Sequence, residues 1–176
     1  MKEYHIGDYL MKLEVGGGEK PRRPHWKQCD IRNLPTVDFC CNALDIKKQI
    51  PNNTVEIIYS RHFLEHMTYI EGEKLLTDWY DILKPTGCVE LEVPNITFHI
   101  NQWINNRNDP KQIKHAKAGF WGWQGKNPKR QVEFDLHKAG YDKQEIRELI
   151  TRIGFINFKS LNPETSPHLH ILCYKP

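Results

Sequence analysis

A short apolar segment that stops at three consecutive glycines is the feature that most limits how this chain can fold. Residues 9–15 are rich in apolar side chains, and Gly16, Gly17 and Gly18 follow them directly. Glycine lets the backbone turn sharply and lets its N–H groups approach a ligand closely. The pattern predicts a strand that runs into a loop, and by itself this loop is equally consistent with a plain turn.

Further short apolar runs follow at regular intervals in the first half of the chain. One ends at residue 31, and others cover residues 37–41 and 55–60, with Pro, Asn and charged residues between them. Residues 69–83 instead repeat apolar side chains at helical spacing and are followed by Pro85 and Gly87. We expect four strands, one amphipathic helix and then a buried strand over residues 88–93.

The second half begins with a segment of a different kind. Residues 95–131 mix aromatic, amide and lysine side chains without sustained periodicity, so we expect an insertion with partial helix. Asp142 and Glu145 form a capping pair for a helix that Gly154 ends. Residues 155–161 and 168–174 read as an antiparallel terminal pair of strands. The order predicts one α/β domain over residues 1–176 with a mostly parallel sheet.

Composition sets the broad class of the protein. The 176 residues are 39% hydrophobic and 27% charged, with a net charge of +3. This composition predicts a globular chain and argues against disorder and against a strongly nucleic-acid-like protein. No apolar run approaches the roughly 20 residues that span a bilayer, and the N-terminus lacks a secretory pattern. We expect a cytoplasmic location with no membrane association, and five reduced cysteines.

The residues that end the expected strands carry the chemistry, because ligands of open α/β sheets bind at the carboxyl ends of the strands. Glu14 and the three glycines end the first strand, and Asp30 ends the second, where a carboxylate can accept both ribose hydroxyls. Asn42 follows the third strand and offers an amide to an adenine edge. Ser60 and His62 follow the fourth. Each has a plainer reading, such as a surface Asp beside a turn.

Taken in order, these segments resemble the class I S-adenosylmethionine-dependent methyltransferases, and specifically a small predicted group of the type 11 kind. The resemblance spans nearly the whole chain and rests on LEVGGG, WKQCDI, IPNNTVEIIYSRHFLEH, LKPTGCVELEVPN and DLHKAGYD. It implies a Rossmann-like sandwich with seven strands, the C-terminal one antiparallel, and S-adenosylmethionine as cofactor. It also implies a cofactor site made by Glu14, Gly16, Gly17, Gly18, Asp30, Ile31, Asn42, Ala43, Ser60 and His62.

Two departures from the family pattern stand out. A full helical crossover needs a dozen residues or more, yet the chain passes from Gly18 through a Pro- and Arg-containing segment almost directly to the second strand. We therefore expect a shortened first crossover, with Lys20, Arg22 or Arg23 supplying the positive charge that a helix N-terminus would otherwise give. The plainer alternative is that these side chains serve only solubility. Asn42 stands where many relatives carry Asp, which keeps an acceptor but removes a charge.

A rival reading starts from residues 62–66. The sequence HFLEH fits the H-x-x-E-H pattern of some zinc metallopeptidases, with His62 and His66 on one helical face and Glu65 as a general base. The pentapeptide directly follows an apolar strand, however, and this reading gives the glycine loop no purpose. We expect no metal.

The aromatic segment suggests where an acceptor binds. It supplies Trp103, Phe120, Trp121 and Trp123, and six basic residues but no acidic one lie between positions 111 and 130. We expect a polar or anionic acceptor such as a sugar, a nucleotide or a glycan precursor, with RNA a further option. The plainer reading is a lid whose tryptophans pack on the core.

Methyl transfer from a sulfonium needs mainly alignment, and a base only for hydroxyl or amine acceptors. His66 and His137 are the candidate catalytic bases, and both can equally be structural. The alternative to an enzyme is a non-catalytic module that binds an adenosyl ligand or RNA. Either a monomer or a homodimer is compatible with the sequence.

Overall fold

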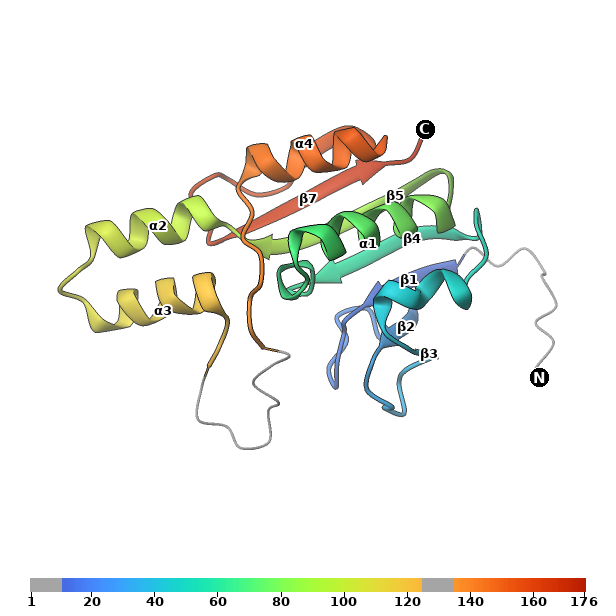
Figure 1. The fold of residues 1–176 in the computed structure, drawn as a ribbon, viewed down its shortest axis with the longest axis horizontal. Helices are drawn as coiled ribbons and strands as arrows, with labels where there is room; N and C mark the ends of the chain where they lie inside the picture. The colour runs from blue at the N-terminus through green and yellow to red at the C-terminus, as the bar shows by residue number, and fades with distance from the viewer. Residues whose placement is uncertain (1–10, 125–134) are drawn as a thin grey trace.

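Seven strands form a single sheet in the computed structural model, which describes residues 11–124 and 135–176 (Figure 1). The strand order is β3-β2-β1-β4-β5-β7-β6. The strands are β1 (Met11–Val15), β2 (Lys27–Asp30), β3 (Phe39–Cys40), β4 (Val55–Arg61), β5 (Leu83–Pro94), β6 (Ile156–Ser160) and β7 (His168–Tyr174). β7 runs antiparallel to both of its neighbours, β5 and β6, and all the other strand pairs are parallel. The predicted mostly parallel sheet with an antiparallel C-terminal strand is confirmed.

The first crossover is short, as the sequence predicts. Residues 16–26 join β1 to β2 through turns alone, and residues 31–38 join β2 to β3 in the same way. Pro21 and Pro24 lie in the first of these links, where they remove backbone donors that a helix would use. Two connections that carry helices in a complete doubly wound sheet therefore carry none here.

Three helical elements form one layer on the sheet. They are the short 3-10 helix η1 (Ala43–Lys48), α1 (Tyr69–Ile82) and α4 (Lys143–Ile153). Figure 1 shows α1 and α4 side by side in front of the sheet, and α1 also packs against η1. The core between this layer and the sheet contains fully buried side chains, including Leu13, Ile58, Leu75, Trp79, Val89, Leu91 and Ile146. Both long helices begin with capping boxes, at Thr68 with Glu71 and at Asp142 with Glu145.

The opposite face of the sheet carries polar side chains at alternate strand positions. On β5, for example, Glu90 and Glu92 are half-buried, while Val89, Leu91 and Val93 point into the core. Among the residues that the structure describes, the helices that pack on the sheet all lie on the other face. We call this second surface the open face.

The predicted insertion after β5 is more regular than its sequence suggests. It begins with α2 (Ile96–Asn105) and α3 (Pro110–Trp121), two helices that form a hairpin beyond the carboxyl end of β5 (Figure 1). Asn95 and Asp109 cap them, and Pro110 occupies the first turn of α3. These caps are the signals that reveal both helices when apolar periodicity is weak. Residues 125–131 of the insertion lie outside the described part of the chain.

Two other boundaries differ from the sequence prediction. The first long helix ends at Ile82, and β5 begins at once with Leu83, which pairs with Val55 ahead of Lys84 to Gly87. The register then shifts, and regular pairing resumes between Ile57 and Cys88.

None of the described helices combines the length and the apolar composition needed to cross a membrane.

Candidate functional site

The carboxyl ends of four parallel strands bring the predicted site residues to one edge of the sheet. Val15 of β1 stands beside Cys29 of β2 and Ser60 of β4, and Asp30 stands beside Cys40 of β3. The residues that follow these positions are therefore neighbours, as the sequence order implies. They comprise the glycine loop, Asp30 with Ile31, Asn42 with Ala43, and His62.

The glycine loop is held in a conformation that only glycine adopts easily. Gly16 and Gly18 have φ angles of +77° and +65°, and the Gly16 N–H donates to the Cys29 carbonyl at 2.9 Å. The space beside the loop is filled by the protein itself. A methyl group added at Gly16 would lie 2.4 Å from Phe63, and one added at Gly18 would lie 2.6 Å from Arg32.

Glu14 lies below this loop and holds the segment that follows it. Its side chain is buried, and its carboxylate accepts hydrogen bonds from the backbone N–H groups of Arg22 and Arg23 at 2.8 and 2.7 Å. Gln28 adds an amide hydrogen bond at 3.2 Å. A carboxylate with three donors is strongly fixed. In this structure Glu14 orients the short crossover rather than pointing into open space.

Asp30 ends β2 with its carboxylate fully engaged. It accepts the Gly18 N–H at 3.0 Å and the Arg32 N–H at 3.0 Å, and the Arg32 guanidinium bonds to both oxygens. Burial alone would raise the pKa of Asp30, but the hydrogen bonds and charge of Arg32 lower it overall. A ribose can reach this carboxylate only if the exposed Arg32 side chain turns away. Sequence reasoning overlooked Arg32, although its position two residues after Asp30 makes such a pair easy to form.

The remaining predicted cofactor residues differ in accessibility. Ile31 is 51% exposed, which leaves an apolar surface beside Asp30. Asn42 is exposed and caps η1, because its Oδ1 accepts from the Leu44 N–H at 3.0 Å. Within the described part of the chain, its amide donors have no hydrogen-bond partner. Ala43 is buried, and Ser60 is fully buried with its hydroxyl donating to the Val15 carbonyl. This buried hydrogen bond links β4 to β1, so the Ser60 side chain is not exposed at the carboxyl edge of the sheet.

His62 stands at the turn after β4 in a conformation that is unusual for a side-chain-bearing residue. Its φ angle is +50°, its backbone N–H donates to the Glu92 carbonyl, and its ring meets that of His168 edge-on at 4.6 Å. Left-handed conformations of such residues store strain and concentrate at functional sites. Burial and the nearby His62 and Arg61 lower the pKa of His168 to about 4.

The pentapeptide at residues 62–66 is not an α-helix, so the premise of the peptidase reading is wrong. His62 lies in the turn, and only Leu64–His66 form a single turn of 3-10 helix, η2. His62 Nδ1 instead bonds to Glu65 Oε1 at 3.1 Å. The two histidines of the pattern therefore do not share a helical face.

The two predicted catalytic histidines do lie together. The rings of His66 and His137 are 5.1 Å apart, although 70 residues of chain separate them, and the buried Glu65 stands beside both. Burial lowers the pKa of His137 although the nearby charge of Glu65 acts in the opposite direction. Burial therefore favours the neutral imidazole of His137, the form that can accept a proton.

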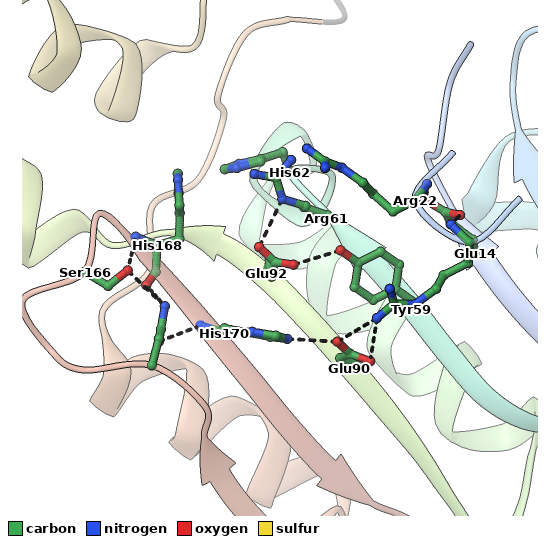
Figure 2. A network of polar contacts seen from close by, with 12 residues as sticks. Glu14, Arg22, Tyr59, Arg61, His62, Glu90, Glu92, Ser166, His168 and His170 are labelled. Atoms are coloured by element: carbon green, nitrogen blue, oxygen red, sulfur yellow. Dashed lines mark hydrogen bonds and ion pairs between the residues drawn. The ribbon is translucent and has the colours of Figure 1, made fainter. Parts of the chain in front are cut away.

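Two linked groups of polar side chains occupy the open face beside this edge (Figure 2). Glu92 accepts the Tyr59 hydroxyl at 2.7 Å and Arg61 Nε at 3.0 Å. Glu90 pairs with Arg23 at 3.2 Å and with His170 at 2.9 Å. Of the predicted compensating charges, Arg23 is thus committed to Glu90, whereas Lys20 and Arg22 are exposed.

The helical hairpin carries the aromatic side chains of the expected acceptor wall. Ile96, Ile100, Trp103, Ile104, Phe120 and Trp121 line a hollow of about 470 Å³. Lys117 and Arg107 lie over the Trp103 ring, and Lys114 lies over Trp123 at 5.0 Å. The other predicted basic residues, Lys126, Lys129 and Arg130, fall outside the described residues.

Comparison with known proteins identifies the fold. The sequence matches no protein-family model and no curated protein. A SAM-dependent methyltransferase from Archaeoglobus fulgidus superimposes with a TM-score of 0.62 at 15% identity, over 96% of this chain and 87% of that one. One from Methanosarcina mazei gives 0.60 at 14%, over 94% and 92%.

Human N-acetylserotonin methyltransferase, solved in complex with SAM, gives a TM-score of 0.57 at 13% identity, over 94% of this chain and 47% of the human one. Likeness at these identities establishes architecture. The chain therefore has the fold of the class I S-adenosylmethionine-dependent methyltransferases, as the sequence resemblance predicted.

Proposed function

We propose that this protein transfers the methyl group of S-adenosylmethionine to a polar or anionic acceptor. The observation that carries the proposal is the position of Asp30. This residue ends β2, and its carboxylate accepts the Gly18 N–H at 3.0 Å. The fold around it is shared with many methyltransferases. A carboxylate there, beside a glycine loop, suits the ribose of an adenosyl ligand.

The neighbouring residues fit the rest of such a ligand. The exposed Ile31 side chain offers an apolar surface to an adenine ring, and the free amide donors of Asn42 can bond to its edge. Gly16 to Gly18 keep the space above β1 free of side chains of their own. Arg32 and Phe63 now fill part of that space, so binding requires both to shift.

S-adenosylmethionine supplies a methyl group activated by a positively charged sulfur. The contribution of the protein is then alignment in a site that excludes water, with removal of one proton when the acceptor is a hydroxyl or an amine. Nε2 of His66 or of His137 can accept that proton, because both Nδ1 atoms are committed to backbone carbonyls.

The acceptor preference follows from the helical hairpin. Lys111, Lys114 and Lys117 are exposed along α3, and the hollow beside Trp103 adds apolar surface. Positive charge next to aromatic rings favours an anionic group attached to a ring or a chain. Sugar phosphates, nucleotide-linked sugars and glycan precursors combine these features.

Calorimetry with S-adenosylmethionine and S-adenosylhomocysteine tests the cofactor site first. We expect saturable binding that Asp30→Ala weakens about tenfold or more, the typical cost of a lost hydrogen bond to a charged group. Release of S-adenosylhomocysteine on addition of anionic acceptors then tests transfer. Absence of binding by the wild-type protein would refute the proposal.

A second candidate function is non-catalytic binding of an adenosyl ligand or of RNA, and the basic residues over Trp103 and Trp123 favour it. Fluorescence anisotropy with a labelled single-stranded RNA separates the two. Tight, salt-dependent RNA binding that Trp123→Ala and Lys114→Gln weaken, with no release of S-adenosylhomocysteine in the presence of any acceptor, would support the binding module instead.

A further inference from the structure

Glu65, His66 and His137 form a compact group beside the end of β4. The backbone carbonyl of Glu65 accepts N–H groups from Lys138 and Ala139 at 2.8 and 3.2 Å, and these bonds hold the segment after residue 135 against η2. His137 is thereby brought next to two residues that lie some 70 positions earlier. One nitrogen or oxygen atom from each of the three side chains lies within 4.8 Å of the others.

Both histidines are oriented through their Nδ1 atoms. His66 Nδ1 bonds to the Leu136 carbonyl at 3.0 Å, and His137 Nδ1 bonds to the Gly119 carbonyl at 2.9 Å. A carbonyl only accepts, so each Nδ1 carries a hydrogen, and in the neutral ring the lone pair lies on Nε2. Histidines that bind metals are usually fixed in this way by a backbone carbonyl or a carboxylate.

The carboxylate of Glu65 is incompletely satisfied. Its side chain is 1% exposed, Oε1 accepts from His62 and lies 3.9 Å from His137 Nε2. Oε2 is buried and has no hydrogen-bond partner among the described residues. A buried carboxylate with an unpartnered oxygen is costly, and a cation bound by this carboxylate would lower the cost.

We infer that Glu65, His66 and His137 bind one divalent cation of the zinc type. Two imidazole nitrogens and one carboxylate oxygen suit Zn²⁺ or Co²⁺ better than Mg²⁺ or Ca²⁺, which prefer oxygen ligands alone. Ligands about 2 Å from a tetrahedral ion stand roughly 3.4 Å apart, so small side-chain rotations close the site. Three protein ligands leave a fourth position for water or a substrate atom.

This site is not the one that the HFLEH pattern suggests. The pattern pairs His62 with His66, whereas the structure pairs His66 with His137 and uses His62 to hold the carboxylate. The inference goes beyond the proposed function, because metal binding needs neither cofactor nor acceptor. One consequence does rest on that function: an ion on both Nε2 atoms removes them as proton acceptors in methyl transfer.

The test is a titration of chelator-treated, full-length protein with Co²⁺, without S-adenosylmethionine, followed by visible absorption and by competition with Zn²⁺. We expect one equivalent to bind with the strong absorption of a low-coordinate site. His66→Ala and His137→Ala should weaken binding tenfold or more, and Glu65→Gln should also weaken it. His25→Ala, which removes an exposed histidine elsewhere, should bind as the wild type does.

Two results would overturn the inference: no binding of Co²⁺ or Zn²⁺ by the wild-type protein, or unchanged binding by His137→Ala. Thermal unfolding of the wild-type protein with and without zinc tests the site without any variant. Zinc should raise the unfolding midpoint, because a ligand that binds only the folded state stabilises it, and no rise would count against the site. Since cofactor is absent throughout, a failure of the proposed methyl transfer cannot produce these results.

Discussion

The guanidinium of Arg32 forms two hydrogen bonds with the carboxylate of Asp30 at the carboxyl end of β2. Nε lies 2.9 Å from Oδ1 and Nη2 lies 3.1 Å from Oδ2. The Arg32 side chain is 51% exposed, whereas that of Asp30 is 6% exposed. The arginine is therefore the partner with room to turn away, and hydroxyl groups of a ribose would have to replace it.

The first prediction follows from this exchange. Arg32→Ala should tighten binding of S-adenosylhomocysteine several-fold, because the ligand no longer has to displace an ion pair, while Asp30→Ala should weaken it. Calorimetry on both variants measures the two changes. Arg152→Ala, which removes a surface arginine paired with Glu73, is the matched control and should leave affinity unchanged. Equal weakening by Arg32→Ala and Asp30→Ala would mean that the arginine itself contacts the ligand.

The second prediction concerns Gly16 and Phe63. Gly16→Ala should destabilise the protein by about 1–3 kcal/mol, because it places a side chain at a positive φ angle and against the Phe63 ring. In a Phe63→Ala background the same change should cost about 1 kcal/mol less. Urea denaturation of the four proteins of this cycle gives the coupling free energy. Strict additivity would show that the two residues do not compete for space.

The third prediction tests the open face. Tyr59→Phe removes a hydroxyl that donates to Glu92 at 2.7 Å, and it should lower the free energy of unfolding by about 1 kcal/mol or somewhat more. Tyr80→Phe is the control, because the described residues offer the Tyr80 hydroxyl no hydrogen-bond partner and contact its ring. A loss as large for Tyr80→Phe as for Tyr59→Phe would contradict the assignment.

The fourth prediction concerns acid. His168 has an ordinary pKa of 6.5 and a pKa of about 4 in the folded protein, so the unfolded chain binds the proton more readily. Its contribution to stability is complete above pH 6.5 and is lost as the pH falls toward 4. The lowered pKa values of His99 and His137 act in the same direction.

Urea denaturation at pH 7 and at pH 5 measures this loss. The His168→Gln protein should lose less stability between the two pH values than the wild type. His25→Gln, at an exposed position, should lose as much as the wild type. An unchanged pH dependence in His168→Gln would show that the pKa of His168 does not differ between the folded and unfolded protein.

Much of the fold could be predicted because local patterns and strand order agree. The apolar run before Gly16, the capping pair Asp142 with Glu145, and the turn-separated strands at the C-terminus each specify one element, and connection rules assemble them. The same order brings Asp30, Asn42 and His62 to one edge of the sheet. This part of the candidate site needs no long-range information.

Other features depend on contacts that no local pattern encodes. His137 reaches Glu65 because Lys138 and Ala139 bond to the η2 backbone, and residues so far apart in sequence give no periodic signal. The pattern at residues 62–66 suggested an α-helix, but Glu65 bonds to His62 and the chain makes only a 3-10 turn. The hydrogen bonds from Arg32 to Asp30 likewise depend on a side-chain conformation that the sequence pattern does not specify.

The polar side chains of the open face limit the number of layers that pack on this sheet. A sheet needs a separate apolar partner for each apolar face. Glu90 and Glu92 alternate with core residues on the interior strand β5, and stacking another sheet or helix on them would bury charges that are now partly hydrated. In the described part of the chain the helices that pack on the sheet lie on one side, and on the other side this alternation leaves Glu90 and Glu92 in partial contact with water.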